Sequence, residues 1–176
     1  MASDLVAMGK LSADLKREHR TSTPNLWAES PFEWLRNETP SQKGAIGKEM
    51  FKRWAQSAGF DVAVAPGRSE CDCVVAGLKV VVKFGLQWAN GTLVFQQIRR
   101  QDYALGALLG LEPQRVHLWV VPRDILWCGS QEQHGSETHW LRFRPSEPPR
   151  MLARFGGTLA AAQASLLKQA GGERGS

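Results

Sequence analysis

Asp72 and Lys83 are the residues of this chain whose types and spacing most favour catalytic chemistry. They lie in the stretch Ser69 to Phe84, which the pattern predicts to be two short strands joined by a tight turn at Ala76-Gly77. Alternation along the second strand places Lys83 on the same face as Val81. A lysine on an apolar strand is costly unless a partner uses it. A carboxylate can bind a cation, and an ammonium group beside it can stabilise negative charge that develops in a reaction.

The flanking sequence predicts the elements that position this pair. Apolar residues recurring every four positions predict a helix over 42–58, which Gly59 ends. A first strand is expected at 60–65, and the hairpin strands at 72–76 and 78–84. A second long helix over 94–109 and a strand over 115–121 complete the order helix, three strands, helix, strand.

This order, with the acid and the lysine of the hairpin, resembles the core of the PD-(D/E)xK nucleases, the restriction-endonuclease-like superfamily. The stretches Lys83-Phe84-Gly85-Leu86-Gln87-Trp88 and Phe95-Gln96-Gln97-Ile98-Arg99 look like those of bacterial type II restriction-like enzymes, and the similarity covers about 32–125. The resemblance implies an α/β fold with an αβββαβ core, in which helices flank a mixed central sheet.

The resemblance also implies roles for individual residues. Asp72 is expected to bind Mg²⁺, with Mn²⁺ as a possible substitute, because Mg²⁺ prefers carboxylate oxygens. The backbone carbonyl of Val82 would be a second ligand. Lys83 would orient the attacking water or stabilise developing charge, and Glu49 matches the helix acid of the family. Gln97, on the helix expected at 94–109, would reach the scissile phosphate or its water.

Basic residues lie on both sides of this hairpin in the sequence. The net charge is +5, which favours a polyanionic partner, and double-stranded DNA is the partner that the resemblance implies. The expected DNA contacts are Lys43, Lys48, Gln96, Arg99 and Arg100. Such enzymes commonly form homodimers to cut both strands.

The chain departs from the family pattern at Val81, where a second acid is expected. Glu49 or Glu70 could replace that acid. Alternatively, the protein is a catalytically inactive DNA-binding module that keeps the fold, or a nuclease disabled at this single position. A third function class, a small domain whose tryptophan-rich surface binds protein, would show no DNA binding.

Composition excludes several other classes of protein. No apolar run approaches the ~20 residues that cross a membrane, and the N-terminus lacks the basic and apolar segments of a secretory signal. A cytoplasmic location without a membrane partner is therefore expected. Cys71, Cys73 and Cys128 form neither a disulfide framework nor a zinc motif with the four histidines.

The chain is long enough for one domain. The expected organisation is an N-terminal helix and a Pro/Trp-containing arm over 1–40, a nuclease-like core over 41–125, a strand and a helix over 126–170 that complete the same domain, and a disordered tail over 171–176. The helix is expected at 4–20, and within 126–170 a polar loop at 128–137, an edge strand at 138–144 and a helix at 158–169. Base recognition is expected in the segments 21–40, 85–92 and 122–140.

Overall fold

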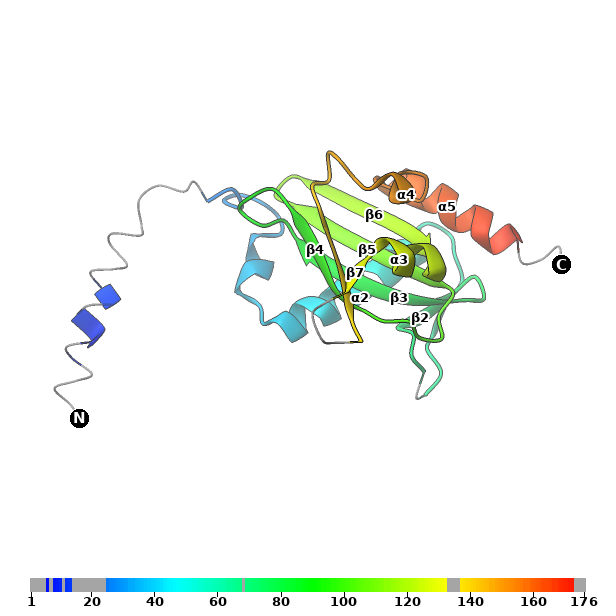
Figure 1. Ribbon diagram of the computed structural model, residues 1–176, viewed down its shortest axis with the longest axis horizontal. Coiled ribbons are helices and arrows are strands. Elements are labelled where there is room, and N and C mark those ends of the chain that lie inside the picture. Colours follow the sequence, from blue (N-terminus) through cyan, green and yellow to red (C-terminus); the bar gives the residue numbers. More distant parts are fainter. Residues whose placement is uncertain are drawn as a thin grey trace.

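The computed structural model places a five-stranded sheet at the centre of the molecule (Figure 1). The structure describes residues 6, 8–10, 12–13, 25–67, 69–132 and 137–172. The strands of the central sheet are β1 (Val62–Val64), β2 (Cys73–Val75), β3 (Leu78–Leu86), β5 (Leu105–Glu112) and β6 (Arg115–Pro122). Their spatial order is β1-β2-β3-β5-β6. Only β3 and β5 are parallel, so the sheet is mixed, as expected.

A second, three-stranded sheet packs against one face of the central sheet. Its strands are β4 (Leu93–Ile98), β7 (Gln131–Glu132) and β8 (His139–Phe143), in the order β4-β8-β7. Leu93, Phe95 and Leu141 of this sheet share a buried cluster with Leu108 and Trp119 of the central sheet. This packing fixes β4 close to β3.

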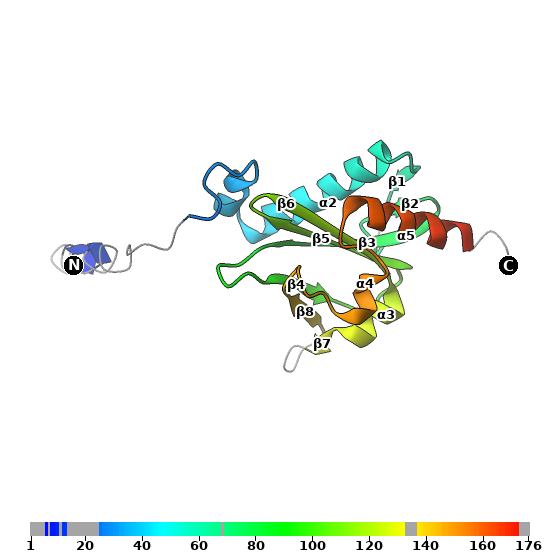
Figure 2. The same cartoon turned by 90° about the horizontal axis from the view of Figure 1, so that it is seen from above.

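Helices cover the opposite face of the central sheet and one end of the sandwich. The helices are the 3₁₀ turn η1 (Glu33–Asn37), α2 (Pro40–Ser57), α3 (Arg123–Gly129), α4 (Arg150–Ala153) and α5 (Leu159–Gly172). Side chains of α2 and α5 join one core cluster with the central sheet, while α3 and α4 pack with the second sheet. Figure 2 shows the resulting layers, with α2 on one side of the central sheet and β4, β7 and β8 on the other.

The N-terminal end of α2 is fixed by its capping residues. The Thr39 side chain accepts a hydrogen bond from the Gln42 backbone, and the Gln42 side chain accepts one from the Thr39 backbone, which is a capping box. Gly59, just after the helix, adopts a φ of 88°, a left-handed conformation that glycine favours. Helix α2 therefore begins two residues before the expected helix and ends one residue earlier.

Gly47 allows α2 to approach β3 closely. A Cβ atom at this position would lie 2.3 Å from Cγ of Phe84. Changing Gly47 to alanine should therefore lower the free energy of unfolding by about 1–3 kcal/mol, because the overpacked helix must shift. Denaturant-induced unfolding measures this change. Gly44, on the same helix, provides the control, because a Cβ atom there would have no neighbouring atom within 4 Å. Gly44→Ala should be neutral or stabilising by up to about 1 kcal/mol. Equal effects of the two changes on stability would contradict the close packing at Gly47.

The prediction of a helix over 94–109 is wrong. This segment contains β4, a loop and most of β5, and the segment that connects the parallel strands β3 and β5 carries a strand of the second sheet instead of a helix. In β5 every residue from Leu105 to Leu111 is buried. A central strand buried on both faces carries apolar residues at every position and so fits a helical period by chance. Gly110 lies inside β5, where a Cβ atom would lie 2.3 Å from Leu93.

The two ends of the chain agree only in part with the sequence-based expectations. Residues 25–39 pack on the body of the domain, with Trp27 and Leu35 buried against Leu111. Residues 6, 8–10 and 12–13 are helical, and the rest of the helix expected at 4–20 lies outside the described residues. The prediction of a disordered tail over 171–176 is wrong for Gly171 and Gly172, which belong to α5. Residues 173–176 lie outside the described residues.

The C-terminal part contains more regular structure than expected. The polar loop expected at 128–137 instead holds the end of α3 and strand β7, whereas 133–136 lie outside the described residues. The strand expected at 138–144 and the final helix are both present, as β8 and α5. The prediction that this strand lies at an edge is wrong, because β8 pairs with β4 on one side and with β7 on the other. Among the described residues, no helix combines the length and the apolar character needed to span a lipid bilayer.

Candidate active site

The candidate site lies where β3 extends beyond its neighbour β2. Strand β2 pairs with β3 only from Leu78 to Val80, whereas β3 continues to Leu86. On its other side β3 stays paired with β5 over its whole remaining length. One edge of β3 from residue 81 onward therefore has no strand partner in the described structure, and its backbone groups need other partners.

Asp72 lies directly at this open edge. Its backbone N–H donates to the carbonyl of Val80 at 2.8 Å, which is the last strand-like contact of β2. Its side-chain Oδ2 accepts a hydrogen bond from the Val82 backbone N–H at 2.7 Å. Because the N–H and C=O of one residue in a strand project from the same edge, the Val82 carbonyl lies on the same open edge as Asp72. The two oxygens expected as metal ligands thus come from adjoining positions.

The second Asp72 oxygen is paired with a lysine of α2. The Lys48 ammonium lies 2.6 Å from Oδ1, and the Asp72 side chain keeps 17% of its surface exposed. The sequence predicts Lys48 as a DNA contact. In the structure its ammonium pairs with the Asp72 carboxylate. Glu49, expected to be the auxiliary acid, is the next residue of the helix.

Glu49 is held away from the site by its own helix neighbours. Its two oxygens pair with Lys52 at 3.0 Å and with Arg53 at 2.8 Å, and 48% of its side chain is exposed. The hydrogen bond from Arg53, followed by that from Lys52, lowers the pKa of Glu49. Both partners lie three and four residues further along the helix, the spacing at which charged side chains meet. Glu49 therefore does not join Asp72 in this structure.

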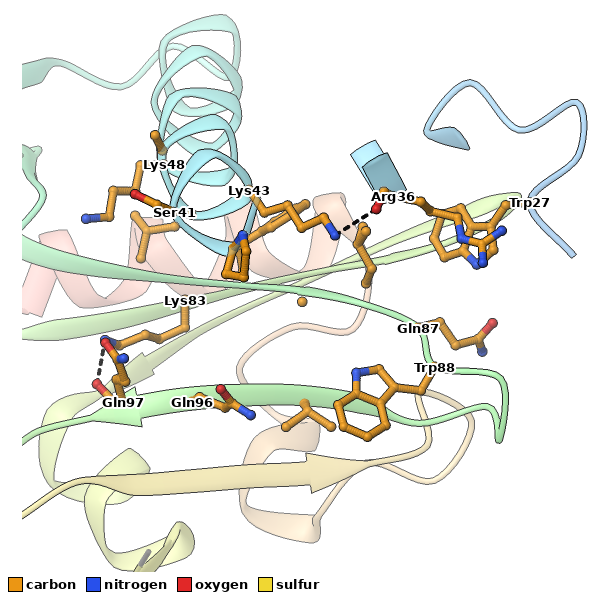
Figure 3. Close-up of a pocket in the computed structure, with 18 residues that line it drawn as sticks. Trp27, Arg36, Ser41, Lys43, Lys48, Lys83, Gln87, Trp88, Gln96 and Gln97 are labelled. Carbon is orange, nitrogen blue, oxygen red and sulfur yellow. Dashed lines mark hydrogen bonds between the residues drawn. The ribbon is translucent and has the colours of Figure 1, made fainter. Parts of the chain in front are cut away.

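Lys83 reaches from β3 to the backbone of β4. Its ammonium donates to the Gln97 carbonyl at 2.6 Å, as Figure 3 shows. Burial lowers the pKa of Lys83, and the neighbouring Asp72 carboxylate opposes this shift. The lysine is thus partly removed from water, close enough to Asp72 for their charges to interact.

The carbonyl that holds Lys83 belongs to a strained residue. Gln97 adopts a φ of 55°, and the pairing of β4 with β8 shifts register between Phe95 and Ile98. Such a bulge re-aims one residue of a strand, and residues other than glycine in this region of φ are concentrated at functional sites. Gln97 therefore contributes its backbone carbonyl to the site. It lies on strand β4 and not on the helix expected at 94–109.

A groove of about 930 Å³ runs along the open edge of β3, between the N-terminal half of α2 and strand β4. Figure 3 shows its two sides, with Lys43 and Lys48 on α2 and Gln96 and Gln97 on β4. No carboxylate lines the groove among the described residues. Its polar and aromatic lining is Trp27, Arg36, Ser41, Lys43, Lys48, Lys83, Phe84, Gln87, Trp88, Gln96 and Gln97. This charge distribution suits a polyanion.

Arg99 and Arg100 lie elsewhere. Both are exposed, and together with Glu70 they line a separate hollow of about 860 Å³ beside the second sheet. The Glu70 carboxylate accepts a hydrogen bond from the Asp102 backbone N–H at 2.7 Å. Glu70, the other candidate for the expected second acid, therefore binds the loop that precedes β5. Arg99 still acts on the site through its charge, which lowers the pKa of Lys83.

Val81 occupies the position at which the family resemblance leads us to expect a second acid. It is 5% exposed and packs with Cys71 and Tyr103, on the same face of β3 as Lys83. Within the described part of the chain, no three His, Cys, Asp or Glu side chains lie close enough to hold a metal ion. The oxygen donors at the open edge are therefore one carboxylate and backbone carbonyls.

Four residues line the groove that the sequence does not predict individually as site residues, although they lie in the segments 21–40 and 85–92, where base recognition is expected: Trp27, Arg36, Gln87 and Trp88. The sequence contains one signal for them, since tryptophan and arginine recur in the arm before α2 and Gln87-Trp88 follow the hairpin directly. Their convergence depends on the packing of 25–39 against Leu111. Such long-range packing has no local signature.

Comparison with known proteins gives a similarity of fold. No protein-family model matches the chain, and no curated protein matches it. Among solved structures the chain is similar to a bacterial homing endonuclease, I-Ssp6803I, with a TM-score of 0.56 and 20% sequence identity. The similarity covers 77% of this chain and 96% of that chain. The chain has a nuclease-like fold, and at this level of identity the likeness concerns the fold alone.

Proposed function

We propose that this protein is a Mg²⁺-dependent endonuclease of the PD-(D/E)xK type that hydrolyses phosphodiester bonds in double-stranded DNA. The observation that carries the proposal is the position of Asp72 and Lys83 at the open edge of β3, beside a groove lined by cations and free of carboxylates among its described residues. The similarity to a homing endonuclease supports the same class of substrate.

The oxygen donors fit a weakly held Mg²⁺ or Mn²⁺ ion. Asp72 Oδ1 and the Val82 carbonyl would hold it, since Mg²⁺ binds proteins through one or two carboxylates and keeps several waters. When bound, the ion would lower the pKa of a coordinated water and offset charge on the phosphate. Lys48 now neutralises Asp72, and its ammonium must leave Oδ1 when the ion binds.

The cationic side chains have two proposed roles, binding the DNA backbone and stabilising charge during the reaction. Lys43, Lys48 and Arg36 line the groove where they can pair with backbone phosphates, which fixes the position of the duplex. The Gln97 carbonyl holds the Lys83 ammonium in place, so Lys83 can donate a hydrogen bond to the attacking water or to a phosphate oxygen as negative charge develops. Gln96 and the side chain of Gln97 line the same groove.

A homodimer would bring two such sites to the two strands. Each groove would then place one Lys83 beside one scissile phosphate. The exposed Arg99 and Arg100 would add electrostatic attraction outside the groove.

Changing Lys48 to methionine tests the assigned metal ligand without DNA. The change removes the ammonium that competes with the ion for Asp72 Oδ1, so Mn²⁺ should bind about 2- to 5-fold more tightly, the worth of an exposed ion pair. Titration of Mn²⁺ followed by electron paramagnetic resonance measures the affinity. Lys52→Met is the matched control, because Lys52 pairs with Glu49 instead. Equal affinities in both variants and the native chain would contradict Asp72 as the ligand.

A second candidate function is a catalytically inactive DNA-binding module. The observation in its favour is Val81, buried against Cys71 and Tyr103 where a second acid is expected. This alternative retains the groove and its salt-sensitive DNA binding. It differs from the endonuclease in one result, the absence of hydrolysis in Mg²⁺ and in Mn²⁺.

Cleavage of supercoiled plasmid tests the proposed function. The native chain is expected to convert plasmid to nicked and linear forms in Mg²⁺ or Mn²⁺, and chelation of the metal should stop the reaction. DNA binding without cleavage in either metal would replace the endonuclease with the binding module. Cleavage only after Val81→Glu would show a nuclease scaffold disabled at that position.

A further inference from the structure

The second sheet has an outward-facing surface that the proposed chemistry does not use. Leu141 and Phe143 of β8 are buried against the central sheet, so the alternate residues Trp140 and Arg142 face outward. The same alternation on β4 turns Gln96 outward and places Val94 on this side, although Val94 is only 8% exposed. Gln131 of β7 pairs with Trp140. We call these five residues the outer face: Val94, Gln96, Gln131, Trp140 and Arg142.

The outer face continues into the groove. Val94 and Gln96 belong to both surfaces, and Trp88 joins them from the loop after β3. The Arg142 guanidinium lies 5.9 Å from the centre of the Trp88 ring. Figure 3 shows the Trp88 ring beside β4, near Gln96. A ligand that fills the groove therefore meets the outer face without a break.

Three polar side chains of the outer face remain available to bind a ligand. In the part of the chain that the structure describes, the side chains of Gln96, Gln131 and Arg142 make no hydrogen bond to protein, and all three residues are exposed. None of the five outer-face residues is a carboxylate. Arginine pairs in a bidentate manner with the major-groove edge of guanine, and glutamine with that of adenine. Paired strands are also narrow enough to enter the major groove.

We infer that the outer face enters the major groove of the bound duplex and reads base edges, with Arg142 and Gln96 as the specificity-determining side chains. This inference rests on the proposed function, because the groove must hold a duplex for the sheet to reach its bases. Lys43 and Lys48, in contrast, would contact phosphates and carry no sequence information.

Selection from a randomised duplex library, without divalent metal, tests the inference on the full chain. The native protein should enrich a motif, and Arg142→Ala should reduce the preference for guanine at one or two of its positions by about 10- to 100-fold. Gln96→Ala should act at other positions. Arg142→Lys should lose the same preference as Arg142→Ala, since lysine keeps the charge but not the bidentate geometry.

Arg154→Ala is the matched control. Arg154 is also exposed and lies 4.8 Å from the centre of an aromatic ring, that of Phe155, but it directly follows α4, beyond the outer face. Its loss should leave the motif unchanged. Thermal melting should show that all the variants are folded.

The outcomes separate this inference from the proposed function. An unchanged motif in Arg142→Ala and Gln96→Ala, or DNA binding by the native chain with no motif at all, would overturn the outer face as the reader. Plasmid cleavage is scored independently: cleavage with an unchanged motif leaves the endonuclease intact, and a shifted motif without cleavage leaves the reader intact. Failure of the native chain to bind any duplex at low salt would overturn both.

Discussion

Changing Asp72 to asparagine is expected to lower plasmid cleavage by about 10²- to 10³-fold, because the change removes the charge that would hold the metal ion. Asparagine keeps a side-chain oxygen that can accept the hydrogen bond from the Val82 N–H, now 2.7 Å long. The fold should therefore survive. Rates of plasmid nicking over a series of Mg²⁺ concentrations measure the effect, and higher metal should restore only part of the activity.

Asp72→Ala separates the structural role of this residue from its chemical role. Alanine removes the charge and also leaves the Val82 N–H without its partner, which should lower the free energy of unfolding by about 1–3 kcal/mol relative to asparagine. Equal stability of the two variants would show that the hydrogen bond contributes little. Undiminished cleavage by Asp72→Asn would remove Asp72 from the site.

Changing Lys83 to methionine is expected to have a similarly large effect on cleavage, again about 10²- to 10³-fold, the typical loss when one charge-stabilising donor is removed. Methionine keeps most of the apolar stem that crosses from β3 to β4. Single-turnover cleavage of a linear duplex measures the rate. Lys79→Met is the control, because Lys79 lies on the same face of β3 but pairs with Asp102; loss of cleavage in this variant too would point to a general effect of charge.

The pH dependence of stability adds a readout for Lys83 that does not require activity. Burial lowers the pKa of Lys83 in the folded state, so between that value and the ordinary lysine value the unfolded chain binds more protons. The native chain should therefore gain stability relative to Lys83→Met as the pH rises through this interval. Thermal melting from neutral to alkaline pH measures the difference, and a gain towards lower pH would contradict a desolvated lysine.

Local signals in the sequence suffice to predict the hairpin that carries Asp72 and Lys83. Ala76 and Gly77 adopt positive φ values of 51° and 87°, the conformation of a two-residue hairpin turn, and the strands on either side follow the expected alternation. This local geometry places Asp72 across from β3 and Lys83 on the face of Val81. The placement of Asp72 and Lys83 on the hairpin can therefore be predicted from turn chemistry and strand alternation, whereas their proposed roles come from the resemblance.

The surroundings of the hairpin depend on tertiary packing that has no local signal. Strand β5 carries no polar side chain from Leu105 to Leu111, where every residue is buried, and such a pattern also fits a helix. As a result the sequence does not show that Gln97 lies on a bulged strand, with its carbonyl turned towards Lys83. The pairing partner of a strand is fixed only when distant segments meet.

The helix that carries Glu49 does contain a local signal against its role as the second acid. Glu49 is followed by Lys52 and Arg53 at the spacing that forms ion pairs along a helix, and the structure contains both pairs. Lys48, one residue earlier, points from α2 to Asp72. The helix residue that faces Asp72 is therefore the cation Lys48 and not the neighbouring acid Glu49. With a single carboxylate at the site, we expect metal binding to be weak.

The most direct test of the central claim is cleavage of supercoiled plasmid by the native chain beside Lys83→Met, in Mg²⁺ and in Mn²⁺. We expect nicked and linear products from the native chain in at least one metal, and a loss of about 10²-fold or more in the variant. Equal cleavage by both proteins would show that the activity does not come from this site. No cleavage by the folded, DNA-binding native chain in either metal would contradict the endonuclease.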